Sequence, residues 1–212
     1  LDDAVTARGG RPPGVNIAIE KYIPMGGGLG GGSSDAATTL IALNHLWQGG
    51  LTRSELMTLG LQLGADVPFF LLGENAFVEG IGEQLTAVPT PATWFVVIHP
   101  GISVPTPVIF RAPELTRNTK AVRIADFSAG PLGFGKNDLQ AVAARAFPPA
   151  SDAIEWLSGF SEAPMTGSGA CVFAAFALES EADAVLQRVP AAWRGWKARS
   201  LAAHPMAHLL PS

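Results

Sequence analysis

A glycine-rich stretch that runs directly into an amphipathic pattern is the feature that most constrains this chain. Residues 24–35 read PMGGGLGGGSSD. The residues that follow place apolar side chains at the spacing of one helix face, namely Ala36, Leu40, Leu43 and Trp47. The sequence therefore predicts a glycine loop that delivers the chain to the N-terminus of a helix over residues 36–47.

A loop of this kind has a chemical meaning. The first N–H groups of a helix lack partners within the helix, and they lie at the positive end of its dipole. Glycine lets the backbone approach a bound group closely, so phosphate is the favoured guest. The hydroxyls of Ser33 and Ser34 could act as N-cap acceptors, as donors to a phosphate or as ligands of a metal. The candidate phosphate-binding residues are Gly26, Gly27, Gly28, Leu29, Gly30, Gly31, Gly32, Ser33 and Ser34.

Two better-known glycine motifs fit this stretch less well. A Walker P-loop has a lysine after its last glycine, and here Gly32 stands in that place. The spacing of Gly26, Gly28 and Gly31 matches G-x-G-x-x-G, but any glycine run would match it too. A flexible linker is the remaining alternative. It is disfavoured because the tract lies between Ile-Pro-Met and a strongly periodic helix.

Composition excludes several classes of protein. The chain has 212 residues, a formal net charge of −4 and no basic run, which argues against a nucleic acid or an anionic membrane as its main partner. A hydrophobic content of 48% with 15% charged residues is typical of a folded globular chain. The apolar runs are too short to span a bilayer, and residues 1–8 do not resemble a signal peptide. The single cysteine, Cys171, excludes an internal disulfide and fits a reducing compartment.

The rest of the chain mixes strands and helices without a regular βαβ repeat. Thr52 and Glu55 have the spacing of a capping box ahead of a helix that continues to about Leu61. Ser180 is the predicted cap of a later helix with Asp183 at the box position. These elements predict an α+β fold. The other predicted elements are strands at 15–20, 94–98 and 171–176, a hairpin at 76–85, a turn and short helix at 105–110, and helices at 138–147, 151–157 and 181–189.

Asp66 is the leading candidate for a general base. It stands at the start of an apolar run, among Leu, Ala, Val and Phe, where a carboxylate must be paired, hydrogen-bonded or shifted in pKa. The alternative is an Asx-turn or N-cap residue before Pro68, which is common for aspartate. Catalysis and capping can coexist, so both interpretations stay open.

Other candidate groups are weaker when they are taken singly. The small-residue loop 166–170 could bring backbone N–H groups near an anion, although such a loop is more often only a tight turn. Lys21 could neutralise a phosphate, but a single lysine is usually solvated. Phe110 could stack on a base, with core or surface packing as the alternative. No Cys/His cluster or G-x-S-x-G elbow points to a zinc site or a hydrolase, and no spacing identifies metal ligands.

The glycine stretch, extended to Ala37, resembles the P-x-x-x-G-L-G-S-S-x-x-A phosphate-binding motif of the GHMP kinase superfamily. Further blocks that are similar to this family run in family order over nearly the whole chain, so the chain is identified as a member of it. They are 63–70 (LGADVPFF), 99–101 (HPG), 105–110 (PTPVIF), 137–139 (NDL) and 165–173 (MTGSGACVF).

The resemblance implies a two-domain fold. Residues 1–88 would be the remainder of an ATP-binding N-terminal domain related to ribosomal protein S5 domain 2. Residues 89–212 would form a C-terminal, ferredoxin-like α+β domain. Family members begin with a segment that contains a Pro-Ala-Lys-Leu-Asn-like motif, whose lysine partners the catalytic aspartate. No such segment precedes Leu1, so N-terminal strands are expected to be missing and the chain alone is expected to fold imperfectly or to be inactive.

The triple-glycine form of the loop is similar to that of members that phosphorylate the 2-hydroxyl of a cytidine diphosphate-linked methylerythritol, in the non-mevalonate isoprenoid precursor pathway. The resemblance implies ATP and Mg²⁺ as cofactors. It places the glycine stretch on the triphosphate and Lys21 and Pro24 near the nucleotide, and it assigns to Asp66 the removal of a proton from the attacking hydroxyl. The substrate-binding residues that it implies are Thr106, Phe110, Gly167, Ser168 and Gly169.

Two other functions remain open. Another GHMP kinase could act on homoserine or a mevalonate derivative, and it would need no aromatic slot for cytosine. A non-catalytic nucleotide-binding module is the second alternative. The expected partners are ATP and a small-molecule substrate, with no nucleic acid and no membrane. A monomer or weak homodimer in the cytoplasm is expected.

Overall fold

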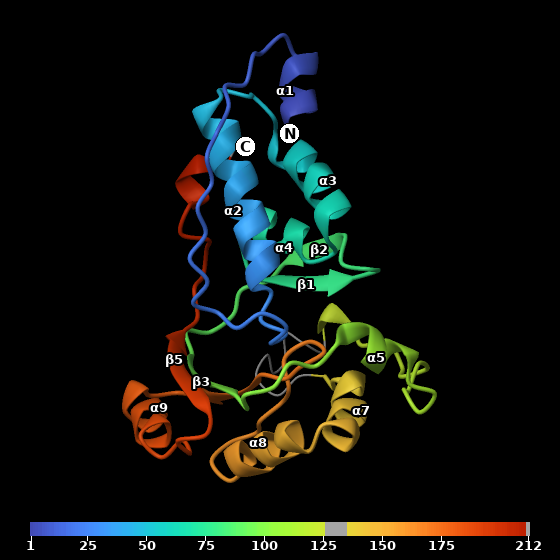
Figure 1. Cartoon of the computed structure of the whole chain (residues 1–212), viewed down its shortest axis with the longest axis vertical. Helices are drawn as coiled ribbons and strands as arrows, with labels where there is room; N and C mark the ends of the chain where they lie inside the picture. The colour runs from blue at the N-terminus through green and yellow to red at the C-terminus, as the bar shows by residue number, and fades with distance from the viewer. Residues whose placement is uncertain (126–134, 211–212) are drawn as a thin grey trace. The chain divides into compact units, whose positions relative to one another are not determined.

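A computed structural model describes residues 1–125 and 135–210 (Figure 1). By its internal contacts the chain divides into two compact units. Unit 1 comprises Leu1–Tyr22, Gly30–Thr90 and Leu201–Ser212, and unit 2 comprises Ile23–Leu29 and Pro91–Ser200. The glycine stretch therefore contributes its first part to unit 2 and its second part to unit 1. The resemblance implies a boundary between two domains at residue 88. That boundary stays a prediction.

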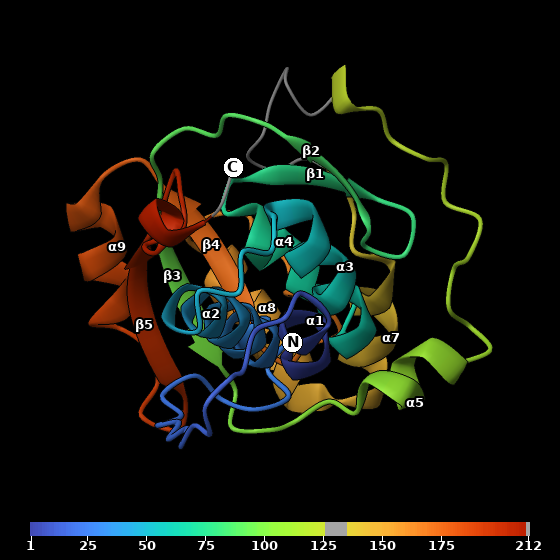
Figure 2. The ribbon, with the colours of Figure 1, turned by 90° about the horizontal axis from the view of Figure 1, so that it is seen from above.

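Helices α2 (Gly31–Leu46), α3 (Arg53–Leu63) and α4 (Val67–Leu72) pack on one another at the centre of unit 1 (Figure 2). Their contact buries Ile41, Leu56 and Leu71 almost completely. The predicted helix after the glycine stretch is confirmed as α2. The predicted capping box is confirmed at the start of α3, because the Thr52 hydroxyl accepts from the Glu55 N–H and the Glu55 carboxylate accepts from the Thr52 N–H.

Smaller elements complete unit 1: helix α1 (Asp2–Ala7), strands β1 (Ala76–Glu79) and β2 (Gln84–Ala87), and the 3-10 helix η1 (Ala207–Leu209). Strands β1 and β2 pair antiparallel, which confirms the predicted hairpin. The strand predicted at 15–20 was wrong, because this segment has no regular structure and leaves Ile17 and Ile19 each 55% exposed. Alternation produces a strand only where a neighbour supplies hydrogen bonds, and no strand in the described residues pairs with this segment.

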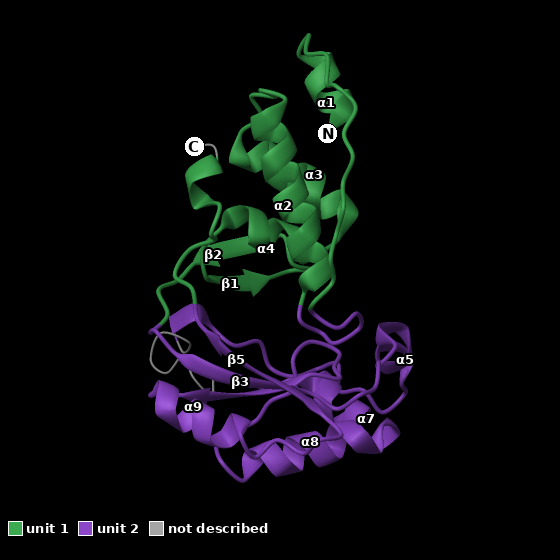
Figure 3. Cartoon of the chain, turned by 60° about the vertical axis from the view of Figure 1, so that its left-hand side comes forward, with its two compact units in different colours: residues 1–22, 30–90, 201–212 green, residues 23–29, 91–200 purple. Residues whose placement is uncertain are grey.

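Unit 2 is built on an antiparallel sheet with the order β4-β3-β5: β3 is Trp94–His99, β4 is Val172–Phe176 and β5 is Arg194–Arg199. Strand β5 was not predicted. Helices α8 (Pro148–Ser158) and α9 (Glu179–Leu186) lie along one face of this sheet (Figure 3). Helix α7 (Asp138–Ala146) packs on α8 and also contacts α5 (Thr106–Arg111). Antiparallel strands with helices on one side confirm the predicted α+β class.

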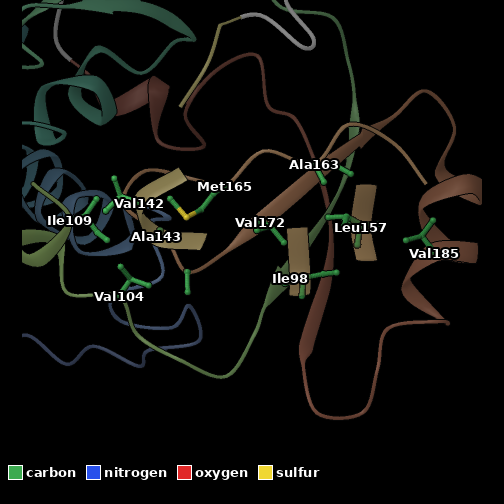
Figure 4. Packing of buried hydrophobic residues seen from close by; sticks show 14 of the residues in the cluster. Ile98, Val104, Ile109, Val142, Ala143, Leu157, Ala163, Met165, Val172 and Val185 are labelled. Carbon is green, nitrogen blue, oxygen red and sulfur yellow. The ribbon is translucent and has the colours of Figure 1, made fainter. Parts of the chain in front are cut away.

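The core of unit 2 lies between the sheet and its helices (Figure 4). Ile98 of β3, Val172 of β4 and Leu157 of α8 are fully buried there. The predicted cap of α9 at Ser180 was wrong, because the helix starts two residues earlier. The Glu181 carboxylate accepts the Leu178 N–H at 3.1 Å, so the capping interaction is already satisfied at Leu178. In the described part of the chain, no helix is long and apolar enough to cross a membrane.

Candidate active site

The start of α2 presents backbone N–H groups that no side chain caps. Gly30 is the N-cap residue with φ 66°, and α2 begins at Gly31 without a side-chain capping hydrogen bond. Ser33 and Ser34 lie inside the first turn, so an N-cap role for them was wrong. The glycines permit this start, because an αL N-cap and a bare first turn expose the helix end. The first turn is therefore open to an anion.

A cavity of about 530 Å³ lies beside this turn, within unit 1. On one side of it, the Lys21 ammonium pairs with the Asp35 carboxylate, and the two side chains are 34% and 38% exposed. Asp35 thus holds the cation that the resemblance places near a nucleotide. A volume of this size falls in the range of small-molecule sites. The cavity is lined by Ile19, Lys21, Gly32, Asp35, Ala36, Thr39, Leu40 and Leu63.

Asp66 stands at the N-cap position of α4, but its side chain makes no capping hydrogen bond. The side chain is exposed and accepts no hydrogen bond from residues 1–125 or 135–210, so the prediction of a paired or hydrogen-bonded carboxylate was wrong. The reason is that α4 directs Val67 and Leu71 into the core while the residue before the helix stays at the surface. No backbone or side-chain group of the described residues therefore engages this carboxylate.

The first part of the glycine stretch is bonded to other segments of unit 2. Pro24 precedes a turn at Met25–Gly26. The Ser103 hydroxyl donates to Met25 O at 3.3 Å, the Cys171 N–H donates to Gly27 O at 3.1 Å, and the Thr166 hydroxyl donates to Gly28 O at 2.5 Å. Gly28 has φ 75°, and a Cβ there would lie 2.2 Å from Thr166 O. The backbone of the glycine stretch thus lies directly against the loop 166–171, which ends at Cys171.

The substrate-binding residues that the resemblance implies also gather in unit 2. Helix α5 begins at Thr106, whose Oγ1 lies 2.7 Å from Ser168 Oγ. Phe110 lies one turn further along α5, and its ring is half-exposed. Gly167 and Gly169 have φ 52° and 91°, which the turn between β4 and the preceding segment requires. Unit 1 contains three further parts of the predicted site: Lys21, the segment Gly30–Ser34 and Asp66.

Two groups fill the space beneath Gly27. A Cβ at Gly27 would lie 2.9 Å from Cys171 Sγ and 3.7 Å from His99 Cδ2. Burial raises the pKa of the Cys171 thiol to about 12. Burial, together with the nearby charge of Arg194, lowers the pKa of His99 below its ordinary value of 6.5. Both groups are therefore neutral at neutral pH. A Cβ at Gly27 would require Cys171 Sγ to shift.

Sequence reasoning assigned no role to two residues that hold the loop 166–171, Asn137 and Gln140. Asn137, the N-cap of α7, donates through Nδ2 to Met165 O at 2.9 Å and to Gly167 O at 2.8 Å. Gln140 Oε1 accepts from the Met165 N–H at 2.9 Å. An asparagine directly before a helical pattern is a recognisable N-cap signal. Nothing local in the sequence reveals its bonds to a loop 28 residues away.

Comparison with known proteins gives the class of the chain. A family model described as "GHMP kinases N terminal domain" matches residues 3–74, and one described as "GHMP kinases C terminal" matches residues 115–195. The chain belongs to the GHMP kinase family, whose members use ATP as a phosphoryl donor. The predicted family, fold class and kinase character are thereby confirmed.

Two individual relatives have high sequence identity to this chain. The chain is 67% identical over 200 residues to the 4-diphosphocytidyl-2-C-methyl-D-erythritol kinase of Herminiimonas arsenicoxydans, covering 94% of this chain and 70% of the relative. It is 65% identical over 199 residues to the enzyme of the same name from Janthinobacterium sp. (strain Marseille), with 94% and 69% covered.

Solved structures agree with this. A crystal structure of 4-(cytidine 5'-diphospho)-2C-methyl-D-erythritol kinase matches with a TM-score of 0.74 and 34% identity, covering 85% of this chain and 68% of that chain. A homoserine kinase from Cytophaga hutchinsonii matches with a TM-score of 0.58 and 18% identity, covering 87% and 69%. At that identity the second match indicates a shared fold alone.

Proposed function

We propose that this chain catalyses transfer of the γ-phosphoryl group of ATP to the 2-hydroxyl of 4-diphosphocytidyl-2-C-methyl-D-erythritol, a step in isoprenoid precursor synthesis. The observation that carries the proposal is the 67% identity over 94% of the chain to a relative named as the kinase of this substrate. The match to the homoserine kinase does not compete with it, because 18% identity supports the fold only.

The glycine stretch would bind the triphosphate. Its residues 26–34 include the uncapped first turn of α2, where N–H groups and the helix dipole favour phosphate oxygens. Lys21 would add a positive charge, held in place by Asp35, and Pro24 would lie near the nucleotide as the first residue of the stretch. The cavity of about 530 Å³ beside Lys21 supports a nucleotide site there.

Asp66 would act on the acceptor alcohol. Phosphoryl transfer depends mainly on positioning and on stabilising charge in a loose transition state, so the protein needs few reacting groups. The Asp66 carboxylate would orient the 2-hydroxyl and take its proton as the oxygen bonds to the γ-phosphorus, while ADP leaves. Its exposure and its lack of a capping bond support this role, because the carboxylate is not engaged elsewhere in the described structure.

Mg²⁺ would arrive with ATP. In the described residues, no three His, Cys, Asp or Glu side chains gather as a group that could hold a metal. Mg²⁺ in kinases is bound largely by phosphate oxygens and water, with one or two protein ligands, so a dedicated cluster is not required. The hydroxyls of Ser33 and Ser34, in the first turn of α2, are the hard oxygen donors that would supplement the phosphates. The ion would neutralise charge that develops on the phosphates.

The cytidylyl end of the substrate would bind in unit 2. The half-exposed ring of Phe110 is available for stacking on cytosine. Thr106 and Ser168 would donate or accept hydrogen bonds, and Gly167 and Gly169 would let the backbone approach the ligand.

No nucleic-acid or membrane partner is proposed, because the net charge is −4 and no basic run is present. We further propose a cytoplasmic monomer or weak homodimer, which light scattering after size exclusion would test.

The experiment is an assay of ADP release with Mg²⁺-ATP and 4-diphosphocytidyl-2-C-methyl-D-erythritol, with homoserine and mevalonate as alternative acceptors. Because this chain matches 70% of the length of the Herminiimonas relative, the assay is run on this chain and on a fusion that adds the part of that relative outside the match. Asp66→Asn tests the base, and Asp152→Asn, an exposed aspartate on α8, is the matched control.

Turnover of the cytidylated substrate alone, lowered about 10²- to 10⁴-fold by Asp66→Asn and unchanged by Asp152→Asn, is the expected result. Turnover of homoserine or mevalonate instead would assign another GHMP activity. ATP binding without turnover of any acceptor, in both forms of the protein, would favour a non-catalytic nucleotide-binding module.

A further inference from the structure

We propose that Asn137 is a positioning residue that holds two parts of unit 2 in place, the first part of the glycine stretch and the proposed cytidylyl-binding residues, a role that rests on the function proposed above. In this proposal Asn137 contacts neither ligand directly. Its side-chain amide instead joins the start of α7 to the loop at Met165–Gly169, and that loop contacts both the glycine stretch and α5.

Both the oxygen and the nitrogen of the Asn137 side-chain amide make hydrogen bonds. Oδ1 accepts from the Leu139 N–H at 3.0 Å, which caps α7, while Nδ2 donates to Met165 O and Gly167 O. An asparagine has one acceptor and two donors in fixed geometry, and here each has a backbone partner. Only this orientation of the amide pairs all of these groups, because backbone carbonyls cannot donate.

The loop that Asn137 holds makes hydrogen bonds to two other segments of unit 2. At one residue, the Thr166 hydroxyl donates to Gly28 O at 2.5 Å and so fixes the glycine stretch. Two residues later, Ser168 Oγ lies 2.7 Å from Thr106 Oγ1 at the start of α5. A displacement of the loop therefore moves the proposed phosphate-binding and cytidylyl-binding groups together. Separate changes at Thr166 or Ser168 move one group each.

Asn137→Asp separates capping from positioning. Aspartate keeps an acceptor for the Leu139 N–H and is as good an N-cap as asparagine. It replaces the two donated bonds with a carboxylate that faces the carbonyls of Met165 and Gly167, so the loop loses its attachment while α7 keeps its cap. Asn75→Asp is the matched control. Asn75 also donates two Nδ2 bonds, to Thr90 Oγ1 at 2.8 Å and Leu201 O at 3.0 Å, but it lies in unit 1.

The kinetic test compares KM values for both substrates. Asn137→Asp is expected to raise KM for ATP and KM for the cytidylated substrate together, by about ten- to a hundredfold each. Thr166→Val is expected to raise KM for ATP alone, and Ser168→Ala to raise KM for the cytidylated substrate alone. Unchanged KM values in Asn137→Asp, or the same joint rise in Asn75→Asp, would overturn the proposal.

A second measurement does not depend on catalysis, so it separates this proposal from the proposed function. The Thr166 and Gly169 N–H groups are bonded to Cys171 O and Thr166 O, both at 2.9 Å. Hydrogen exchange in the ligand-free chain is expected to quicken at least about tenfold over residues 165–171 in Asn137→Asp, while exchange in α7 is unchanged. Equal acceleration in α7, or none in the loop, would show that Asn137 acts only as a cap. A chain that shows the expected exchange but phosphorylates no cytidylated substrate would refute the proposed function alone.

Discussion

The hydroxyl oxygens of Thr106 and Ser168 lie 2.7 Å apart, although 62 positions separate them in the sequence. This bond joins the first residue of α5 to the glycine-rich loop before β4. If the two residues act through this bond, Thr106→Val and Ser168→Ala should each raise KM for the cytidylated substrate. The double variant should then raise this KM no more than one single variant does. The expected coupling energy is about 0.5–1.5 kcal/mol.

A double-mutant cycle on KM measures this coupling, with KM for ATP as an internal reference. Ser158→Ala, an exposed serine at the end of α8, is the matched control and should change neither value. Strictly additive single effects would show that the two hydroxyls act independently.

Gly28 should tolerate no side chain. Its φ of 75° lies in the left-handed region, and an added Cβ would meet Thr166 O at 2.2 Å. Gly28→Ala is therefore expected to destabilise unit 2 by about 2 kcal/mol or more, as strain and a backbone clash add. Urea unfolding followed by tryptophan fluorescence measures the loss. Gly14→Ala, with open space around the added Cβ, should leave the unfolding midpoint nearly unchanged. Equal midpoints for the two variants would contradict the packing described here.

The capping box of α3 should contribute measurably to unit 1. Thr52→Ala removes the acceptor of the Glu55 N–H, so the free energy of unfolding is expected to fall by about 0.5–2 kcal/mol. Thr58→Ala is the control, because the Thr58 hydroxyl donates to Ser54 O inside the same helix and caps nothing. Chemical denaturation of both variants compares the two losses. A loss in Thr58→Ala as large as that in Thr52→Ala would argue against the cap.

His99 should make the free energy of unfolding depend on pH in the acid range. Its folded-state pKa is lowered by burial and by Arg194, and its Nδ1 accepts from the Gly101 N–H, which requires an unprotonated nitrogen. Above its ordinary value of 6.5, both folded and unfolded states are neutral at this residue. Below that value the unfolded chain binds a proton more readily, so the folded state loses stability as pH falls toward the lowered pKa. His99→Gln should flatten this part of the profile of unfolding free energy against pH, and an unchanged slope would contradict the assignment.

Local signals in the sequence predicted much of the fold. The helical spacing from Ala36 to Trp47 and the box formed by Thr52 and Glu55 depend on neighbouring residues, and the structure confirms both. The strand predicted at 15–20 failed, because a strand needs a partner that the pattern itself cannot supply. Strand β5 was missed for the converse reason. Its residues, RGWKAR, show no simple alternation, yet β3 supplies a full edge of hydrogen bonds.

For the candidate site too, some features follow from residue type and motif, and others only from the tertiary structure. The roles proposed for the glycine stretch and for Asp66 follow from residue type and motif, since close approach to a phosphate needs glycine and proton removal needs a base. That Asp66 is exposed and does not cap α4 could not be read from its apolar neighbours, because helix orientation decides which side chains are buried. The contacts made by Asn137 join segments far apart in the chain, so only the tertiary structure reveals them.

The buried thiol of Cys171 offers an intrinsic chemical reporter. With its pKa near 12, the thiol is protonated and shielded at neutral pH, so an alkylating reagent reacts only when this region opens. The same residue donates its N–H to Gly27 O, directly under the glycine stretch. A ligand that steadies this stretch should slow the alkylation. Mass spectrometry of one modified residue could then follow nucleotide binding in an unlabelled chain, without any measurement of turnover.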